Sequence, residues 1–107
     1  MIPVSWHALA RRELFRASDF YEKESVGLGE VFLDAVALGI DHLKLHPRAG
    51  RKVLRESRRY LVARFPYSIV YRVELSVQGN QLFILAVAHQ KRRPLYWTHR
   101  VGGGQAG

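Results

Sequence analysis

The chain has 107 residues, a length that fits one small domain with a single core. Apolar residues make up 48% of it, which is typical of a globular protein and not of a disordered one. It has no cysteine, so a disulfide scaffold, a cysteine-ligated zinc site and a cysteine nucleophile are excluded. No apolar run approaches the roughly 20 residues that span a bilayer, and no signal-peptide pattern opens the chain, so we expect a cytoplasmic protein.

The formal net charge of +8 is unevenly distributed along the chain. Residues 1–46 carry five basic and seven acidic side chains, whereas residues 47–107 carry twelve basic and two acidic ones. Thirteen of the seventeen basic residues are arginine, whose guanidinium suits bidentate contact with phosphate or carboxylate. The second half therefore predicts an anionic partner: a nucleic acid, a protein that works on nucleic acids, or an acidic protein.

The first half of the chain predicts a strand and a helix. The apolar residues 2–6 are typical of an edge strand, and Ser5 is suited to cap the helix that follows. Helical spacing predicts a buried face that comprises Ala10, Leu14, Ala17 and Tyr21. The opposite face, which we expect to be solvated, carries Arg12, Glu13, Arg16, Asp19 and Lys23.

A second helix is predicted after a turn near Gly27. It should end by His46, because Pro47 disfavours helical backbone in the residue before it. Its broad apolar face is expected to comprise Leu28, Val31, Phe32, Ala35, Val36, Gly39, Ile40 and Leu43. Two helices joined by so short a turn should form an antiparallel hairpin that needs another surface to cover.

The second half predicts three or four strands in a meander. Residues 52–54 are typical of a short strand, and residues 59–65 alternate in polarity. Residues 68–77 place four apolar side chains on one face: Ile69, Tyr71, Val73 and Leu75. A hairpin loop at residues 78–80 leads to residues 81–89, which are almost wholly apolar, as expected of a central strand buried on both faces.

The predicted fold class is α+β, with an N-terminal strand and a helical hairpin packed on one face of a small, mainly antiparallel twisted sheet. We assign residues 1–100 to a single domain and residues 101–107 to a disordered glycine-rich tail.

Motifs for conventional catalysis and metal binding are weak. The acidic residues lie on the helices at spacings typical of solvated faces, which does not favour a carboxylate pair for acid–base chemistry. His42 and His46 are four residues apart and could hold a metal, but the glutamate of the zinc-protease motif is missing. We favour the interpretation that the two histidines are polar residues stabilised by the negative end of the helix dipole. No P-loop or dinucleotide fingerprint occurs, so we expect no metal and no cofactor.

Basic and aromatic residues are interleaved in the second half. The group after the last strand comprises His89, Lys91, Arg92, Arg93, Tyr96, Trp97, His99 and Arg100. Such side chains can hold phosphates and stack on bases, and the same set could cleave RNA without a metal. The alternative is a solvated strand end whose aromatic residues simply cover the sheet.

Residues 4–100 resemble the RelE/ParE superfamily of toxins from bacterial type II toxin–antitoxin systems. The most specific segments are RYLVARFPYSIVY at residues 59–71 and ILAVAHQKRRPLYW at residues 84–97. Supporting motifs are Ala8-x-x-x-x-Glu13-Leu14 and Gly27-Leu28-Gly29-x-x-Phe32-Leu33 on the helices. The resemblance implies the α+β fold that the pattern predicts. It also implies an acidic cognate antitoxin that folds on binding and contacts the helix-hairpin and sheet surfaces in a hetero-oligomer.

The superfamily implies two possible activities: ParE-like members poison DNA gyrase, and RelE-like members are ribosome-dependent endoribonucleases that cut mRNA. Where RelE-like enzymes carry two functional arginines, this chain has Ser68 and, in an ungapped match, Gln90. The C-terminal tyrosine of those enzymes has a counterpart in Tyr96. The motif His89-x-Lys91-Arg92-x-Pro94-x-Tyr96-Trp97 is more similar to the ParE-like branch.

We therefore interpret the chain as a toxin that poisons DNA gyrase by binding and not by catalysis. The residues expected to contact the target are Arg59, Arg64, Lys91, Arg92, Arg93, Tyr96 and Trp97. The first alternative is an mRNA interferase acting on the ribosome, in which Tyr96 or His89 is the acid or base and Arg64, Arg92 and Arg93 clamp the phosphate. The second alternative is a family member that is not toxic and only binds its antitoxin.

Overall fold

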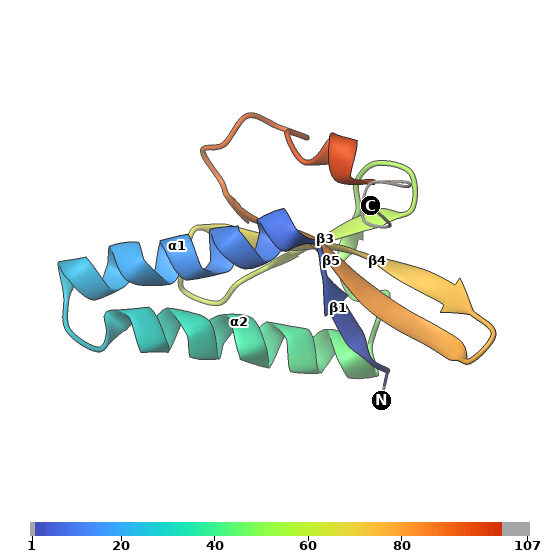
Figure 1. Ribbon diagram of the computed structural model, residues 1–107, viewed down its shortest axis with the longest axis horizontal. Helices are drawn as coiled ribbons and strands as arrows, with labels where there is room; N and C mark the ends of the chain where they lie inside the picture. Colours follow the sequence, from blue (N-terminus) through green and yellow to red (C-terminus); the bar gives the residue numbers. More distant parts are fainter. Residues whose placement is uncertain (1, 102–107) are drawn as a thin grey trace.

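The computed structural model describes residues 2–101, and the tail residues 102–107 lie outside the described residues. In chain order the elements are β1 (Val4–Trp6), α1 (Ala8–Glu24), α2 (Leu28–Leu45), β2 (Arg51–Lys52), β3 (Ser57–Leu61), β4 (Tyr67–Ser76), β5 (Gly79–His89) and the 3-10 helix η1 (Thr98–Arg100). The predicted α+β order of strand, helical hairpin and meander is confirmed, and α1 and α2 run antiparallel beside the sheet (Figure 1). Within residues 2–101 no helix combines the length and the apolar character needed to cross a membrane.

The five strands form one sheet in the order β1-β5-β4-β3-β2. β1 pairs with β5 in parallel, Val4 lying opposite Leu82, and the other three pairings are antiparallel. One core lies between the helices and the sheet, and a second, smaller core lies on the opposite face under the C-terminal segment, residues 90–101. β5 is buried on both faces, as its apolar sequence predicts.

A β-bulge in β5 divides this strand between the two cores. Val70 lies opposite Ala86 but Tyr71 lies opposite Ile84, so Leu85 is the extra residue. As a result Ile84 faces the helices while both Leu85 and Ala86 face the second core. Strict alternation along the strand would have placed these two residues on opposite faces.

Two local predictions are wrong. Ser5 lies in β1, and the helix cap is His7, whose Nδ1 accepts the N–H of Leu9 at 3.1 Å. The strand predicted at residues 52–54 is β2, at Arg51–Lys52. Leu75 continues the predicted alternation of β4 but is 82% exposed, because it lies near the tip of the β4–β5 hairpin, which extends past the helices (Figure 1).

The strand predicted at residues 59–65 is also wrong in its second half. β3 ends at Leu61, because the N–H of Val62 donates to the Tyr67 carbonyl at 2.9 Å and the chain turns between them. Arg64 adopts a φ of 68° in this turn. The turn brings the ring of Phe65 into the helix-side core, where its centroid lies 4.9 Å from that of Tyr21.

The helix hairpin depends on a close approach at Gly29. A Cβ at this position would lie 2.6 Å from the backbone oxygen of Ser18, and the Ser18 hydroxyl donates to the Gly29 carbonyl at 3.2 Å. The carboxylate of Glu22 accepts the N–H groups of Gly27 and Gly29 at 2.9 and 3.0 Å. A side chain of α1 thus caps the N-terminus of α2, where Gly27 has no side chain to do so.

Gly29→Ala should destabilise the protein by about 2 kcal/mol, because the added methyl group meets backbone that cannot yield without separating the helices. Gly39→Ala is the matched control on the same helix: its Cβ would lie 3.1 Å from the flexible end of Ile69 and 3.5 Å, an ordinary contact distance, from the ring of Tyr60. The higher helix propensity of alanine, about 1 kcal/mol, should offset that contact. Urea unfolding measures both variants, and equal stabilities would contradict the close-approach argument.

Candidate target-binding cleft

The C-terminal segment crosses back over the face of the sheet that the helices leave open (Figure 1). Trp97, only 4% exposed, packs in the second core with Val70, Phe83 and Leu85. A partner cannot reach the Trp97 ring in this conformation. Its place in the fold is therefore to hold the segment on the sheet.

Glu13 on α1 fixes the same segment from the other side. Its carboxylate accepts from both terminal nitrogens of Arg100 at 3.0 and 2.9 Å, from the Tyr96 hydroxyl at 2.8 Å and from the N–H of Val87 at 3.0 Å. The prediction that Glu13 lies on a solvated face is wrong, because the C-terminal segment folds over the first turns of α1. In the sequence, the resemblance of the Ala8-x-x-x-x-Glu13-Leu14 motif was the one sign that Glu13 is more than a surface charge.

The Glu13–Arg100 pair also completes an edge of the sheet. β1 reaches only as far as Ile84, so β5 has no neighbouring strand on that side from Leu85 onward. Arg100 donates to the Leu85 carbonyl at 2.9 Å, and Glu13 accepts the Val87 N–H. The two side chains therefore provide the donor and the acceptor that a longer β1 would have provided.

Tyr96 connects this network to the cationic surface. Burial raises the pKa of its hydroxyl above the ordinary value, and the hydrogen bond to Glu13 raises it further. Tyr96 therefore stays protonated as a donor at neutral pH. The guanidinium carbon of Arg92 lies 3.8 Å from the centroid of its ring, in a cation–π contact.

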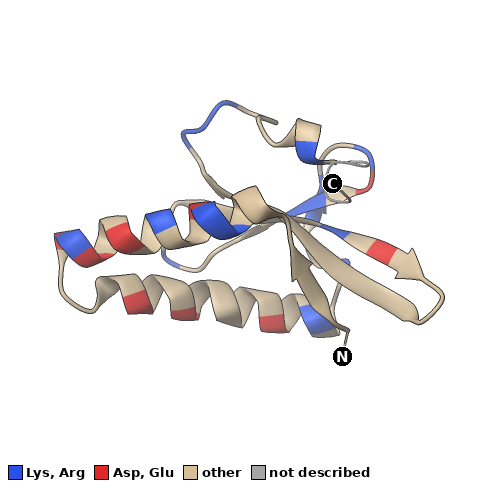
Figure 2. Ribbon diagram, in the orientation of Figure 1, with Lys and Arg blue, Asp and Glu red and all other residues tan. Residues whose placement is uncertain are grey.

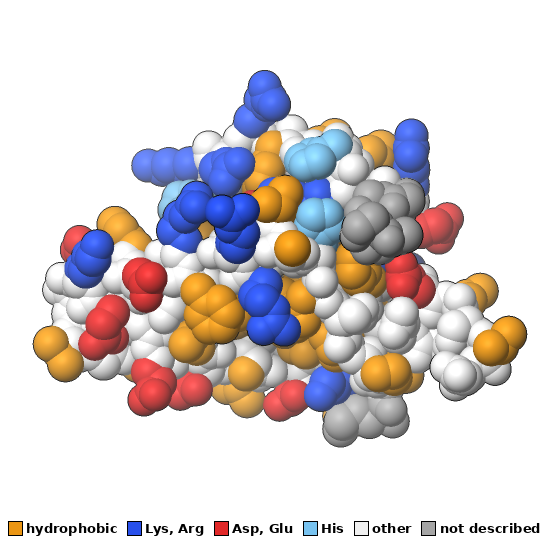
Figure 3. Space-filling view, in the orientation of Figure 1, with side chains coloured by type: hydrophobic (Ala, Val, Ile, Leu, Met, Phe, Trp, Pro, Cys, Tyr) orange, Lys and Arg blue, Asp and Glu red, His pale blue; other side chains and the backbone are white. Residues whose placement is uncertain are grey.

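Arg92 belongs to what we call the basic cleft, a hollow of about 160 Å³ between the C-terminal segment and the adjoining ends of β3, β4 and β5. Its charged and imidazole side chains are Arg59, His89, Arg92 and Arg93, and no acidic residue of the described chain lines it. The cations gather over the C-terminal segment, whereas acidic side chains are concentrated on the helices (Figures 2 and 3). The charges that line the cleft are of the kind that can hold an anionic group.

The structure brings together most of the residues predicted to contact a target. Arg59, Arg92, Arg93, Tyr96 and Trp97 all line the basic cleft. Lys91 is exposed in the loop beside them, and Arg64 lies elsewhere, beside α2.

The groups suggested for RNA cleavage are engaged in other contacts or are absent. Ser68, where the RelE-like pattern has an arginine, is 4% exposed at the wall of the cleft, and Gln90 is exposed. The Tyr96 hydroxyl donates to Glu13. Nδ1 of His89 accepts the N–H of Lys91 at 3.0 Å, which leaves Nε2 to carry the proton of the neutral ring.

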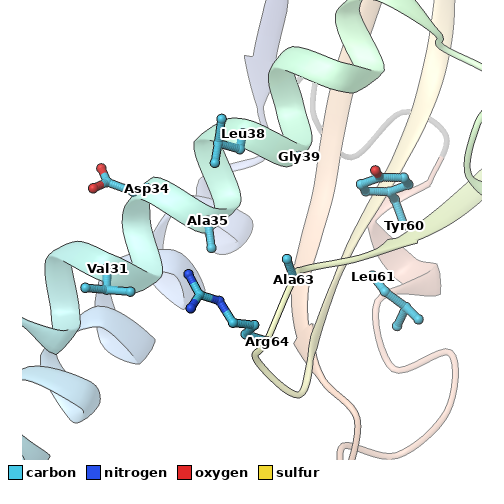
Figure 4. A pocket seen from close by; sticks show the side chains of 9 residues that line it. All are labelled: Val31, Asp34, Ala35, Leu38, Gly39, Tyr60, Leu61, Ala63 and Arg64. Atoms are coloured by element: carbon cyan, nitrogen blue, oxygen red, sulfur yellow. The ribbon is translucent and has the colours of Figure 1, made fainter.

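A second hollow, which we call the helix groove, lies between α2 and the end of β3 and has a volume of about 310 Å³ (Figure 4). It is lined by Val31, Asp34, Ala35, Leu38 and Gly39 of α2 and by Tyr60, Leu61, Ala63 and Arg64. Tyr60 lies close to α2 at Gly39, where a Cβ would be 3.5 Å from its ring, an ordinary contact distance.

The histidine pair considered as a metal site lies at the C-terminal end of α2. The rings of His42 and His46 are 4.9 Å apart, and His42 stacks on Tyr60. Over residues 2–101 no group of three or more His, Cys, Asp or Glu side chains is arranged to hold a metal ion.

The raised pKa of Tyr96 predicts how stability depends on alkaline pH. In the unfolded chain the hydroxyl titrates near pH 10, while the folded protein retains the proton to higher pH. The contribution to stability is therefore complete below pH 10 and is lost as the pH rises toward the folded-state pKa. In urea unfolding between pH 9 and 11.5, the free energy of unfolding should fall less steeply for Tyr96→Phe than for the wild type. Parallel curves would contradict the assignment.

Comparisons with known proteins agree with the fold and the resemblance. A solved structure described as "Chromosomal ParDE TA system from P. aeruginosa" superposes with a TM-score of 0.59 and 24% sequence identity, over 83% of this chain and 96% of that chain. At this identity the likeness shows the shared fold. No curated protein sequence matches significantly.

The family model described as "ParE toxin of type II toxin-antitoxin system, parDE" matches residues 4–94, from β1 into the C-terminal segment. Because that match takes in most of the chain, this protein belongs to the ParE toxin family of type II toxin–antitoxin systems.

Proposed function

We propose that this protein is a growth-inhibiting toxin that poisons DNA gyrase and is neutralised by a cognate antitoxin. Membership of the ParE toxin family supports the toxin role. The observation that supports action through the basic cleft is the arrangement Glu13–Tyr96–Arg92, in which a buried carboxylate holds a tyrosine whose ring holds a cation. A guanidinium fixed in this way loses little conformational freedom on binding.

The chemistry of the cleft supports recognition over bond breaking. An RNA-cleaving site needs a base for the 2′-hydroxyl and an acid for the leaving oxygen. Tyr96 is not available as a base at neutral pH, because its raised pKa keeps the hydroxyl protonated and that hydroxyl donates to Glu13. Nδ1 of His89 is occupied by the Lys91 amide, and Ser68 brings no cation to the transition state.

The positive charge of the chain supports an acidic antitoxin. A net charge of +8 attracts a partner of opposite sign and raises the rate of encounter. Membership of a toxin–antitoxin family implies an antitoxin partner.

Replacing Arg92 and Arg93, two arginines of the basic cleft, should weaken target binding without affecting folding. We expect the wild-type protein to trap gyrase–DNA cleavage complexes and induce the SOS response. Arg92→Gln/Arg93→Gln should lower the yield of cleavage complexes at least about tenfold, which corresponds to about 1.4 kcal/mol of lost contact. The matched control is Arg48→Gln/Arg51→Gln, which removes the same charge from two exposed arginines outside the cleft and should leave activity unchanged.

Other outcomes of the same expression would overturn the proposal. Unaffected supercoiling and an absence of cleavage complexes would exclude gyrase poisoning. Prompt arrest of translation with codon-phased mRNA cuts would support the ribosome-dependent interferase instead. Normal growth without antitoxin would support a member of the family that is not toxic.

A further inference from the structure

A third hollow, which we call the α1 groove, lies between α1, the end of β5 and the C-terminal segment. It has a volume of about 260 Å³, and the side chains that line it include Arg16 and Phe20 of α1, His89 of β5 and Arg92 of the C-terminal segment. His89 and Arg92 also line the basic cleft, so the two hollows adjoin at these residues. Arg16 and Phe20 line neither the basic cleft nor the helix groove.

The α1 groove has cationic groups that the fold leaves available. Basic positions of α1 lie below those of the C-terminal segment in Figure 2, and Arg16 and Arg92 line the same hollow. The exposed guanidinium of Arg16 makes no hydrogen bond and no ion pair within residues 2–101. In the neutral ring of His89, Nε2 is a donor because Nδ1 accepts the Lys91 N–H. These groups suit a phosphate or a carboxylate.

Glu13 is the one acidic residue among the described residues that line the α1 groove, and its charge is already compensated. Its carboxylate is paired with Arg100 and also accepts from the Tyr96 hydroxyl and the Val87 amide. Both of its oxygens are therefore bonded within the fold. An anion that enters the α1 groove meets Arg16 and Arg92 without displacing an existing ion pair of either residue.

Phe20 adds a flat apolar face to this cationic surface. It is 57% exposed, and its ring contacts that of Tyr21 edge-on, with the centroids 5.3 Å apart. Single-stranded nucleic acids bind to such an arrangement, because their phosphates pair with cations while an unpaired base stacks on the ring. The carboxylates of an acidic peptide would use the cations alone, and the bases of a duplex are already stacked on one another. A single strand therefore fits both features of the groove.

We propose that the α1 groove binds a single strand of DNA, with a backbone phosphate on Arg16 and Arg92 and an unpaired base stacked on Phe20. The choice of DNA over RNA rests on the proposed function, since gyrase acts on DNA. Because Arg92 and His89 line both hollows, a strand in the α1 groove can continue into the basic cleft. The toxin then contacts the DNA as well as the enzyme that it poisons.

The test uses the purified full-length toxin and a fluorescently labelled oligothymidylate of about 12 nucleotides, with binding followed by fluorescence anisotropy. Phe20→Leu should weaken binding about tenfold, because leucine has no face on which a base can stack. The matched control is Phe15→Leu, which changes a phenylalanine of similar exposure on the same helix outside the groove and should not alter the affinity.

A second pair of variants tests the phosphate contact. Arg16→Gln should weaken binding about fivefold at about 0.1 M salt and lower the slope of log affinity against log salt by about 0.7. Arg12→Gln removes the same charge from an exposed arginine outside the groove and should change the affinity by less than about twofold. All four side chains are exposed, so the thermal midpoints of the variants should match that of the wild type.

The outcomes separate this inference from the proposed function. Equal losses within either pair of variants would show that α1 attracts DNA without a site, and would overturn the inference. Tighter binding of a duplex of the same length, or of an oligouridylate, would also overturn it. If the toxin traps gyrase cleavage complexes but does not bind the oligothymidylate, the inference alone is overturned and an acidic peptide becomes the ligand to test. Strand binding with the expected variant pattern, by a toxin that leaves gyrase unaffected, would overturn only the proposed function.

Discussion

The rest of the structure depends on the ion pair between Glu13 and Arg100. Both side chains are withdrawn from water, at 13% and 5% exposure, and such a pair is stable only when its remaining polar atoms are bonded. Glu13 meets this condition by accepting from Arg100, Tyr96 and the Val87 amide at once. Both terminal nitrogens of Arg100 are bonded as well, whereas its buried Nε has no hydrogen-bond partner among the described residues. Separating the two partners would leave an unpaired charge out of contact with water. The pair therefore favours one placement of the C-terminal segment against α1.

This ion pair connects the first half of the chain, which has an excess of acidic residues, with the second half, which has an excess of basic ones. α1 belongs to the half with excess acidic residues, yet one of its carboxylates is the support of the basic cleft. Through Tyr96 it fixes Arg92, and through Arg100 it completes the open edge of β5 beyond the bulge. The excess positive charge of the chain lies on the C-terminal segment and β3, whereas most of the acidic residues lie on the helices, where α1 carries basic residues as well (Figure 2).

The spacing of apolar residues predicted the helices and strands in which each face of the element lies in one kind of environment along its whole length. The helix-side faces of α1 and α2 and the fully buried β5 are of this kind. What escaped prediction depends on contacts between distant parts of the chain. Glu13 is 87 positions from Arg100, and nothing near it in the sequence shows that the two meet.

The errors in β3 and at Trp97 have a similar cause. An alternating pattern continues through residues 62–65, but a hydrogen bond to Tyr67 ends the strand and turns Arg64 toward α2. Trp97 stands in a basic, aromatic motif that is typical of a binding surface, and only the second core shows that it is buried. The composition of the motif was sufficient to locate the basic cleft. It did not show which residues are exposed to a partner and which, like Trp97, are buried and hold the segment in place.

Amide hydrogen exchange in Glu13→Gln tests most directly whether this carboxylate holds the cleft together. Under native conditions the amides of Val87 and of residues 97–101 should exchange at least about tenfold faster than in the wild type, while the α2 core amides of residues 36–40 keep their protection. Asp19→Asn, an exposed charge change on the same helix, should alter neither set. Unchanged protection of the C-terminal segment, or equal loss of protection in both sets, would contradict the central role of Glu13.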